Sequence, residues 1–265
     1  MSRRLRLDAE LVRRGLARSR EQAAELIASG RVAVGGQRAV KAASQVGIDA
    51  AITIEQVTGE PEYVSRGARK LAGALAAFGG LTVAGRRCLD AGASTGGFTD
   101  VLLRSGAAHV VAADVGYGQL AWSLQTDERV TVLDRVNVRS LRPEQVAPAP
   151  SLVVADLSFI SLALVIPALV ACAEPDADFV LMVKPQFEVG KQLVGDGVVR
   201  DPELRASAVA AVADSAGQSG LGVLGVTASP LPGPSGNVEY FLWLRRGAPP
   251  LDPDALRAAV ADGPQ

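Results

Sequence analysis

The chain has 265 residues, of which 48% are hydrophobic, enough to form the core of one large domain with a smaller one beside it. Its net charge is −1, yet the first 46 residues hold ten Lys or Arg against four Asp or Glu, a local charge of +6 that predicts a basic module joined to an acidic remainder. No apolar run reaches the roughly 20 residues of a membrane helix and no secretory core follows the basic start, so we expect a cytoplasmic protein without membrane contact.

Two helices and a hairpin are predicted in the basic segment. Leucines recur at helical spacing over residues 7–16 and predict the first helix. Ser19, with Gln22 three positions on, has the pattern of a capping box and predicts the start of the second. The alternating residues 32–34 precede Gly35-Gly36, which predicts a hairpin turn. A small αβ module is therefore expected.

Short motifs in this segment match a known RNA-binding module: Arg6-Leu7-Asp8, Gly15-Leu16-Ala17-Arg18-Ser19-Arg20, Ala23-Ala24-Glu25-Leu26-Ile27 and Gly30-Arg31-Val32-Ala33-Val34. They resemble the S4 domain, which implies such a domain over residues 1–58. The RNA-facing side chains implied by the resemblance are Arg4, Arg6, Arg18, Ser19, Arg20, Arg31 and Lys41. Such groups position a phosphate backbone without reading its sequence. Without the resemblance, the same arginines are equally well interpreted as solvated side chains.

A linker and a helix follow the basic segment. Residues 59–65 contain a proline and are expected to be extended. Ser65 is placed to cap a helix over residues 66–78, which have one apolar face. Lys70 lies near the start of this helix, where a cation is disfavoured. It is either a surface lysine or a residue with a chemical role.

Helices and strands then alternate along the chain. Helices are predicted at 97–105, 119–125, 163–172 and 202–215, and strands at 109–114, 130–133, 152–155, 179–183, 221–228 and 238–244. Alternation of this kind predicts an α/β fold with a parallel sheet, helices on both faces and the last two strands as a hairpin at its edge. The tail from residue 247 is expected to be peripheral.

Residues 88–100 run from a strand end through a glycine-rich turn into a helix, the arrangement that opens a nucleotide crevice in an α/β sheet. Gly92, Ser94 and Gly97 occupy the positions of G-x-G-x-x-G, and serine at the middle position disfavours a pyrophosphate-containing cofactor such as NAD. Asp114, 22 residues after Gly92, suits the binding of ribose hydroxyls. The pattern indicates S-adenosylmethionine, with an ordinary tight turn as the alternative.

Charged residues accompany three other predicted strands. Asp156 and Lys184 directly follow apolar strands, so they should border the same crevice, and Glu239 lies inside an apolar strand, where a charge needs a partner. An amine can take the proton of a ribose 2′-hydroxyl when burial or a second amine such as Lys70 lowers its pKa. Together the four residues predict 2′-O-methyl transfer to RNA, whereas each alone could belong to a structural ion pair.

Five motifs connect these features: Tyr63-Val64-Ser65-Arg66-Gly67, residues 90–100, Asp156-Leu157-Ser158-Phe159-Ile160-Ser161, Val183-Lys184-Pro185-Gln186-Phe187-Glu188 and Gly236-Asn237-Val238-Glu239-Tyr240. On them the chain resembles the TlyA family of S4-domain, FtsJ-like ribosomal RNA 2′-O-methyltransferases, also known as haemolysin-like proteins. The resemblance implies a Rossmann-like class I methyltransferase domain with a mostly parallel seven-stranded sheet over residues 66–247, followed by a tail over 248–265. It implies a monomer that needs no metal and methylates cytidine riboses of 16S and in some cases 23S rRNA within ribosomal subunits.

The resemblance also assigns site residues. The implied catalytic tetrad is Lys70, Asp156, Lys184 and Glu239, with Lys184 as the base. The implied residues for S-adenosylmethionine are Asp90, Gly92, Ala93, Ser94, Thr95, Gly96, Gly97, Phe98, Asp114, Val115 and Asp156.

Other functions fit parts of the pattern. An NAD dehydrogenase needs glycine where Ser94 stands, and an amino-methylating enzyme needs an Asn/Asp-Pro-Pro-aromatic motif at Asp156. A carbon-5 methyltransferase needs a loop cysteine, whereas Cys88 and Cys172 are expected in the core and lack the spacing of a disulfide framework or zinc site. An S4 ribosome-binding factor with an inactive methyltransferase domain and a haemolysin-like protein stay as alternatives. Phe159 is expected in the core or against a nucleotide, and residues 186–197 as a lid or a surface loop.

Overall fold

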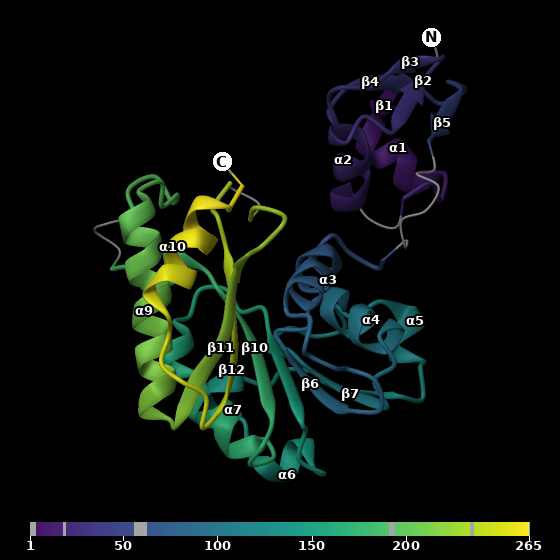
Figure 1. The fold of residues 1–265 in the computed structure, drawn as a ribbon. Helices are drawn as coiled ribbons and strands as arrows, with labels where there is room; N and C mark the ends of the chain where they lie inside the picture. The colour runs from purple at the N-terminus through teal and green to yellow at the C-terminus, as the bar shows by residue number, and fades with distance from the viewer. Residues whose placement is uncertain (1–3, 18–19, 56–62, 191–193, 234–235, 265) are drawn as a thin grey trace. The chain divides into compact units, whose positions relative to one another are not determined.

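The structure is a computed structural model of the chain and describes residues 4–17, 20–55, 63–190, 194–233 and 236–264. The chain forms two compact units, Met1–Glu62 and Tyr63–Gln265 (Figure 1). Residues 59–62 of the predicted linker 59–65 lie outside the described residues.

The smaller unit has two helices packed against short strands. Its elements are β1 Arg4–Arg6, α1 Leu7–Arg13, α2 Arg20–Ala28, β2 Val32–Val34, β3 Gln37–Arg38, β4 Gln45–Gly47 and β5 Ile52–Ile54. β1 pairs with β4, and β2 lies between β3 and β5 in a second antiparallel sheet. The predicted helical stripes are confirmed for Leu7, Leu11, Ala23 and Ile27, which share one buried core. They are wrong for Leu16, which is exposed and lies beyond the end of α1. Ser19, the predicted cap of α2, lies outside the described residues.

The predicted hairpin turn of the smaller unit is also confirmed. Gly35 and Gly36 connect β2 to β3 with φ of 57° and 81°. A two-residue turn with both φ positive follows the right-handed twist of the strands, and glycine adopts it without strain.

The larger unit is built on a seven-stranded sheet. Its strands are β6 Arg87–Ala91, β7 His109–Ala113, β8 Val130–Leu133, β9 Leu152–Ala155, β10 Asp178–Val183, β11 Leu221–Ala228 and β12 Tyr240–Arg246. They lie in the order β11-β12-β10-β9-β6-β7-β8, parallel from β10 to β8, with β12 antiparallel to both of its neighbours. The predicted mostly parallel sheet with a hairpin at its edge is therefore confirmed.

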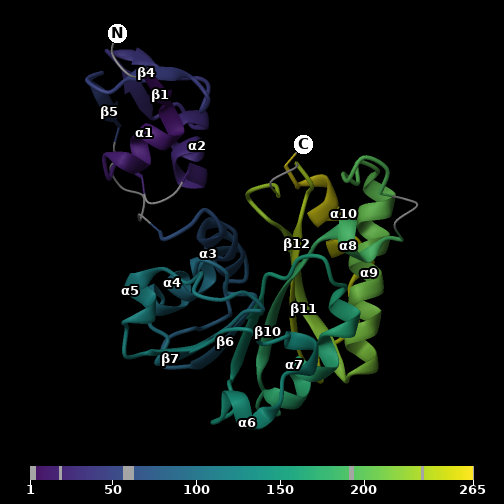
Figure 2. The ribbon, with the colours of Figure 1, turned by 180° about the vertical axis from the view of Figure 1, so that it is seen from behind.

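Helices cover both faces of this sheet (Figures 1 and 2). They are α3 Gly67–Ala77, α4 Gly97–Arg104, α5 Trp122–Gln125, α6 Pro143–Val146, α7 Ile166–Cys172, α8 Pro185–Glu188, α9 Pro202–Gln218 and α10 Pro253–Ala261, with 3-10 turns η1 Val138–Ser140 and η2 Leu162–Leu164. In β10, Phe179 and Leu181 join the core under α7 and α9, whereas Val180 and Met182 join the core under α3, α4 and α5. This period of two decides which helix layer a residue at a strand end faces.

Several predicted helix bounds are wrong. The helix predicted at 119–125 is only α5, because the preceding residues form a loop in which Asp114 and Asp134 accept from the backbone N–H groups of Gly116 and Gly118. The helix predicted at 163–172 is divided into η2 and α7, since Pro167 has no N–H to donate inside a helix and therefore occupies the first turn of α7. Ser65 makes no side-chain cap on α3, whose N-cap residue is Arg66.

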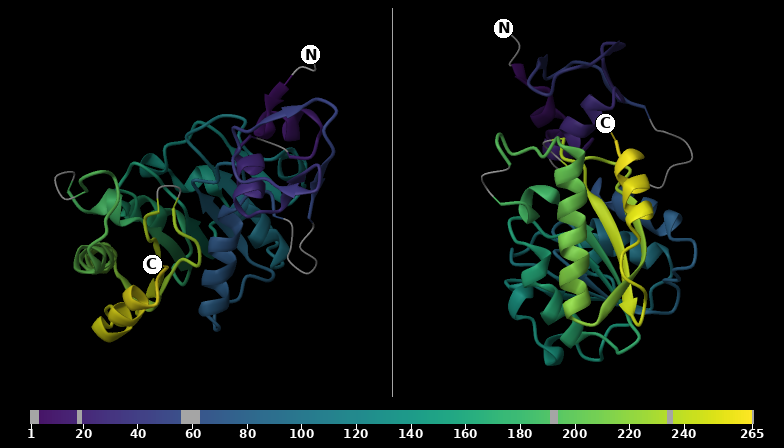
Figure 3. Two further views of the ribbon diagram at one scale, coloured as in Figure 1. Left: turned by 90° about the horizontal axis from the view of Figure 1, so that it is seen from above. Right: turned by 60° about the vertical axis from the view of Figure 1, so that its left-hand side comes forward.

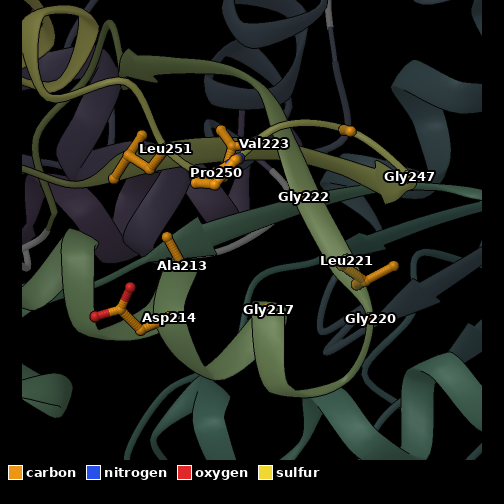
Figure 4. A pocket seen from close by; sticks show the side chains of 11 residues that line it. Ala213, Asp214, Gly217, Gly220, Leu221, Gly222, Val223, Gly247, Pro250 and Leu251 are labelled. Atoms are coloured by element: carbon orange, nitrogen blue, oxygen red, sulfur yellow. The ribbon is translucent and has the colours of Figure 1, made fainter.

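The prediction of a peripheral carboxyl-terminal tail is wrong. α10 packs beside α9 and β11 (Figure 3), and Leu256, only 7% exposed, joins the core under α7 and α9. The segment before α10 borders a hollow of about 440 Å³ at the carboxyl end of α9 and the start of β11 (Figure 4). None of the predicted site residues that the structure describes lines this hollow, so it carries no support for the predicted chemistry.

Candidate active site

The four predicted catalytic residues form two ion pairs. Lys70 on α3 pairs with Glu239, and both side chains are buried, at 6% and 1% exposure. Lys184 Nζ lies 2.6 Å from Asp156 Oδ1 and donates a hydrogen bond to Ser158 Oγ at 2.8 Å. Burial excludes the interpretation of Lys70 as a surface lysine. Each buried amine is instead compensated by a carboxylate, as a charge removed from water requires.

The sheet brings the two pairs to one edge. Asp156 and Lys184 directly follow β9 and β10, which are parallel neighbours, so both residues lie at carboxyl ends of adjacent strands. Glu239 directly precedes β12, whose first residue Tyr240 is opposite Val183, the last residue of β10. Residues that are remote in sequence therefore meet where β9, β10 and β12 lie side by side.

Strand alternation also turns these residues toward one helix layer. Val154, Met182 and Phe241, each two positions from a predicted site residue, belong to the core under α3 and α4. Because side chains two positions apart along a strand point to the same face of a sheet, this face is also the one toward which Asp156, Lys184 and Glu239 are directed. α3 covers this face and supplies Lys70, which explains why the predicted cation near a helix start is stable there.

The glycine-rich turn packs closely against protein on several sides. Gly92 has φ of 87°, and a Cβ added there would lie 2.5 Å from the carbonyl oxygen of Asp156. A Cβ on Gly96 would overlap Leu124, and one on Gly97 would overlap Ser65 and lie 2.8 Å from the backbone nitrogen of Ala68. These glycines therefore permit close packing within the protein, and the Gly92 turn contacts the turn that carries Asp156.

Asp114 shapes the loop beside this turn. Its Oδ2 accepts a hydrogen bond from the backbone N–H of Ser94 at 2.9 Å, and its Oδ1 accepts from that of Gly116 at 2.7 Å. Ser94 adopts φ of 47°, which this contact holds. Because each carboxylate oxygen has two lone pairs, Asp114 keeps the capacity to accept from ribose hydroxyls.

Asp90 is fully buried under the turn, at the end of β6. Its Oδ2 accepts from the Thr99 hydroxyl at 2.6 Å, whereas none of the described residues donates to Oδ1. Burial raises the pKa of Asp90 to about 7; hydrogen bonds from Thr99 oppose the rise, and the negative charges of Asp156 and Asp114 add to it. A buried acceptor without a donor is uncommon, and beside a cofactor turn it is an atom that a bound ligand can satisfy.

The remaining predicted cofactor residues differ in what they expose. The Phe98 ring lies in the core, 6.0 Å from the ring of Phe241, so only its backbone N–H can serve a ligand. That N–H belongs to the first turn of α4, where donors have no partner within the helix. Ala93 is buried, while Thr95 is exposed and the Val115 side chain is 72% exposed.

Three predicted RNA-facing residues lie near Asp8 in the smaller unit. Arg6 and Arg20 both pair with Asp8 Oδ2, at 2.8 and 3.0 Å, and keep about half of their side-chain surface exposed. Hydrogen bonds from Arg6 and Arg20 hold the pKa of the buried Asp8 carboxyl well below its usual range. The Asp8 N–H donates to the carbonyl of Ala42, which brings the exposed Lys41 to the same start of α1.

Of the other predicted RNA-facing residues, the structure describes Arg4 and Arg31. Arg4 is exposed on β1, and Arg31 donates from Nε to the carbonyl of Glu55 after β5, at 2.9 Å. Arg18 and Ser19 lie outside the described residues.

Comparison with known proteins agrees with this geometry. Residues 5–52 match the S4 domain model, and residues 63–246, more than half of the chain, match the model of FtsJ-like methyltransferases. The chain belongs to the FtsJ-like methyltransferase family. It is 63% identical over 271 residues to the 16S/23S rRNA (cytidine-2′-O)-methyltransferase TlyA of Mycobacterium tuberculosis strain H37Rv, covering 100% of both chains. The family predicted from the motifs is therefore confirmed.

Two further relatives extend the comparison. The chain is 35% identical to the Hemolysin A of Brachyspira hyodysenteriae, covering 89% of this chain and 98% of that protein. A solved structure from Streptococcus thermophilus is 36% identical, with a TM-score of 0.78, and covers 98% of this chain and 96% of that one. Both matches span most of this chain.

Sequence reasoning missed polar contacts around the second ion pair of this FtsJ-like methyltransferase. Ser158 touches Lys184, and Ser161 donates to Glu188, yet neither serine carried a predicted role. Phe159 is 91% exposed with φ of 64°, and its ring lies 5.1 Å from that of Phe187, so its predicted core position is wrong. The motifs contained all of these residues, but spacing alone does not indicate which side chains meet across two loops.

The two cysteines of this FtsJ-like methyltransferase are buried in its cores. Burial raises the pKa of the Cys88 thiol to about 12, which makes it a poor nucleophile. In the described part of the chain, no three His, Cys, Asp or Glu are grouped as metal ligands. Over the same residues, no helix combines the length and hydropathy needed to cross a bilayer.

Proposed function

We propose that this protein transfers a methyl group from S-adenosylmethionine to the 2′-hydroxyl of a cytidine ribose in 16S rRNA, with 23S rRNA as a second substrate. The observation that carries the proposal is the meeting of two amine–carboxylate pairs at one sheet edge, where the backbone of Asp156 packs against the Gly92 turn. The 63% identical relative from Mycobacterium tuberculosis, a 16S/23S rRNA (cytidine-2′-O)-methyltransferase, supports the choice of substrate.

The glycine turn fits S-adenosylmethionine. Asp90 Oδ1 offers a buried acceptor, Asp114 offers acceptors at the ribose-binding position, and the first turn of α4 offers backbone N–H donors. When bound, S-adenosylmethionine supplies an electrophilic methyl group on a positively charged sulfur. The carboxylate of Asp114 beside the turn favours a cationic ligand there.

Lys184 is the proposed base. Its Nζ is held between Asp156 and Ser158, so the amine can take the 2′-hydroxyl proton when it is neutral. Asp156 then stabilises the ammonium that results, because it already lies 2.6 Å away. The Lys70–Glu239 pair holds α3 against the start of β12 and so fixes the wall beside this group.

The smaller unit is the proposed anchor on rRNA. Arg6, Arg20 and Lys41 present cations around the start of α1, which suits a phosphate backbone. Phe159 offers an exposed ring beside the Lys184 pair, and an aromatic face of this kind can stack on a nucleotide base. We propose these as the two contacts that bring a ribose to the site.

The test is to map 2′-O-methyl marks on purified 30S and 50S subunits incubated with S-adenosylmethionine and the protein. Wild type should add a mark on a cytidine, and Lys184→Ala should add none while its dissociation constant for S-adenosylmethionine changes less than about threefold. Lys184→Arg is the sharper variant, because arginine keeps the charge beside Asp156 but does not deprotonate in proteins. It should be as inactive as Lys184→Ala.

Two results would contradict the proposal. If Lys184→Arg keeps activity within tenfold of wild type, Lys184 acts through its charge and is not the base. If wild type binds subunits but adds no mark, the protein is a ribosome-binding factor with an inactive methyltransferase domain.

A further inference from the structure

Glu188 connects the two segments that carry the Lys184–Asp156 pair. It is the last residue of α8, the single helical turn that begins directly after Lys184. Its half-buried carboxylate accepts a hydrogen bond from Ser161 Oγ at 2.6 Å and another from the backbone N–H of Leu162 at 2.9 Å. Burial raises the pKa of Glu188, and these two hydrogen bonds oppose the rise. The carboxylate is therefore placed to hold the start of η2.

The loop between Asp156 and Ser161 is contacted along its length by residues 184–188. At its first end, Lys184 contacts Asp156 and Ser158. In its middle, the Phe159 ring lies 5.1 Å from that of Phe187. At its far end, Glu188 holds Ser161 and Leu162. One short segment therefore fixes both ends of the loop.

The backbone of this loop needs such support. Phe159 adopts φ of 64°, a left-handed conformation that residues with a side chain rarely adopt. Its side chain is 91% exposed, so packing of the ring in a core does not hold it in place. A strained residue persists when its surroundings determine its conformation, and the Glu188 contacts lie two and three residues further along the chain.

We propose that Glu188, acting through Ser161, is a positioning residue that fixes the 157–161 loop so that Ser158 stays on Lys184 and Phe159 keeps its exposed position. The role rests on the proposed function, because it concerns the alignment of the base and not the binding of the methyl donor. Both donors to Glu188 are neutral, and the Ser161 hydroxyl can accept as well as donate, so a glutamine that accepts from the Leu162 N–H and donates to Ser161 Oγ should serve.

The test compares Glu188→Ala, Ser161→Ala and Glu188→Gln with a matched control, Glu144→Ala. Glu144 also lies in a single helical turn, α6, but its side chain is exposed. Glu188→Ala should lower kcat on ribosomal subunits at least tenfold, with the KM for subunits and the dissociation constant for S-adenosylmethionine within about threefold of wild type. Ser161→Ala should give a smaller loss of kcat. Glu188→Gln should recover kcat to within about threefold, and Glu144→Ala should match wild type.

Hydrogen–deuterium exchange of the protein without RNA gives a second reading. Glu188→Ala should speed exchange over residues 157–163 and leave β9 and β10 protected. This holds even if the rRNA reaction is wrong, so a wild type that adds no methyl mark would contradict the proposed function and not the loop contact. Unchanged exchange over the loop, an equal loss of affinity for S-adenosylmethionine, or a Glu188→Gln variant as inactive as Glu188→Ala would overturn the positioning role.

Discussion

Removing one partner of the buried Lys70–Glu239 pair should strongly destabilise the larger unit. The two side chains are 6% and 1% exposed, so Glu239→Gln leaves the Lys70 amine buried without its carboxylate. Loss of one partner of a buried pair costs about 3–5 kcal/mol. For a unit of this size, each kcal/mol lowers Tm by about 2–4 °C, so the expected fall is roughly 6–20 °C. Lys70→Met should give a fall in the same range.

The double variant separates charge from shape. Lys70→Met with Glu239→Gln removes both charges, so no uncompensated ion stays in the core and most of the lost stability should return. Methyl transfer should stay lost if the pair also serves the reaction. Asp254→Asn is the control, because the Arg257–Asp254 pair is 70% and 82% exposed, and Tm should change by less than about 2 °C.

Thermal and urea denaturation of the four variants give the measurement. The reasoning is refuted if Glu239→Gln changes the free energy of unfolding by less than about 1 kcal/mol, which is below the range for a buried pair. It is also refuted if the double variant has a free energy of unfolding as low as that of the less stable single variant.

Three further predictions follow from other parts of the structure. Burial raises the pKa of Asp90 to about 7, so between about pH 4 and pH 7 the folded protein keeps a proton on Asp90 that the unfolded chain releases. The contribution of this carboxyl to the free energy of unfolding is therefore fully present at low pH and is lost as pH rises from about 4 to about 7. Urea unfolding at pH 5 and pH 8 should show wild type losing about 2 kcal/mol or more relative to Asp90→Asn, and parallel profiles would contradict the buried carboxyl. In the smaller unit, the double variant Arg20→Ala with Lys41→Ala should weaken rRNA binding and lower the magnitude of the slope of log affinity against log salt concentration by about one to two. Arg257→Ala, the control, should leave that slope unchanged. An unchanged slope in the double variant would contradict the proposal that the smaller unit anchors the protein on rRNA. Gly97→Ala should lower the free energy of unfolding by about 1–3 kcal/mol, because its Cβ would overlap Ser65 and the α3 backbone. Gly217→Ala in α9 places its Cβ in open space and should raise the free energy of unfolding by up to about 1 kcal/mol. Equal Tm values for the two variants would refute this.

The fold was predictable where local pattern and tertiary structure agree. The strand 152–155 was placed at its observed bounds because a buried parallel strand reads as a continuous apolar run. The strand 130–133 was also placed at its observed bounds, although it lies at the sheet edge and is only partly buried, because β-branched residues favour a strand. Prediction failed where short polar contacts or a proline decide the bounds. The one-turn helices α6 and α8 are too short to show a helical period, and the burial of α10 depends on a partner surface formed by distant residues.

The candidate site was predictable as a set of residues but not as a set of contacts. A charge directly after an apolar strand is visible in the sequence, and this identified Asp156 and Lys184. Glu239 was identified as a charge inside the predicted strand 238–244; that placement is wrong, because β12 begins at Tyr240 and Glu239 directly precedes it. Which amine meets which carboxylate depends on strand order and on the position of α3, and neither is encoded in spacing. The role of the glycines was likewise only partly visible, since Gly97 is required by the approach of α3.

The agreement of Val180, Met182 and Lys184 on one face has a consequence for insertions and deletions in this chain. If a single residue were added or lost within β10, the side chain of Lys184 would point to the opposite face of the sheet. Its amine would then lie under α7 and α9, away from Lys70 and from the Gly92 turn. Only changes of two residues would preserve the facing of the amine, and those would displace it along the strand by about 7 Å. Length variation in functional relatives should therefore be confined to connecting loops such as 126–129 and 247–252, while the segments from Leu152 to Asp156 and from Asp178 to Lys184 keep a fixed count.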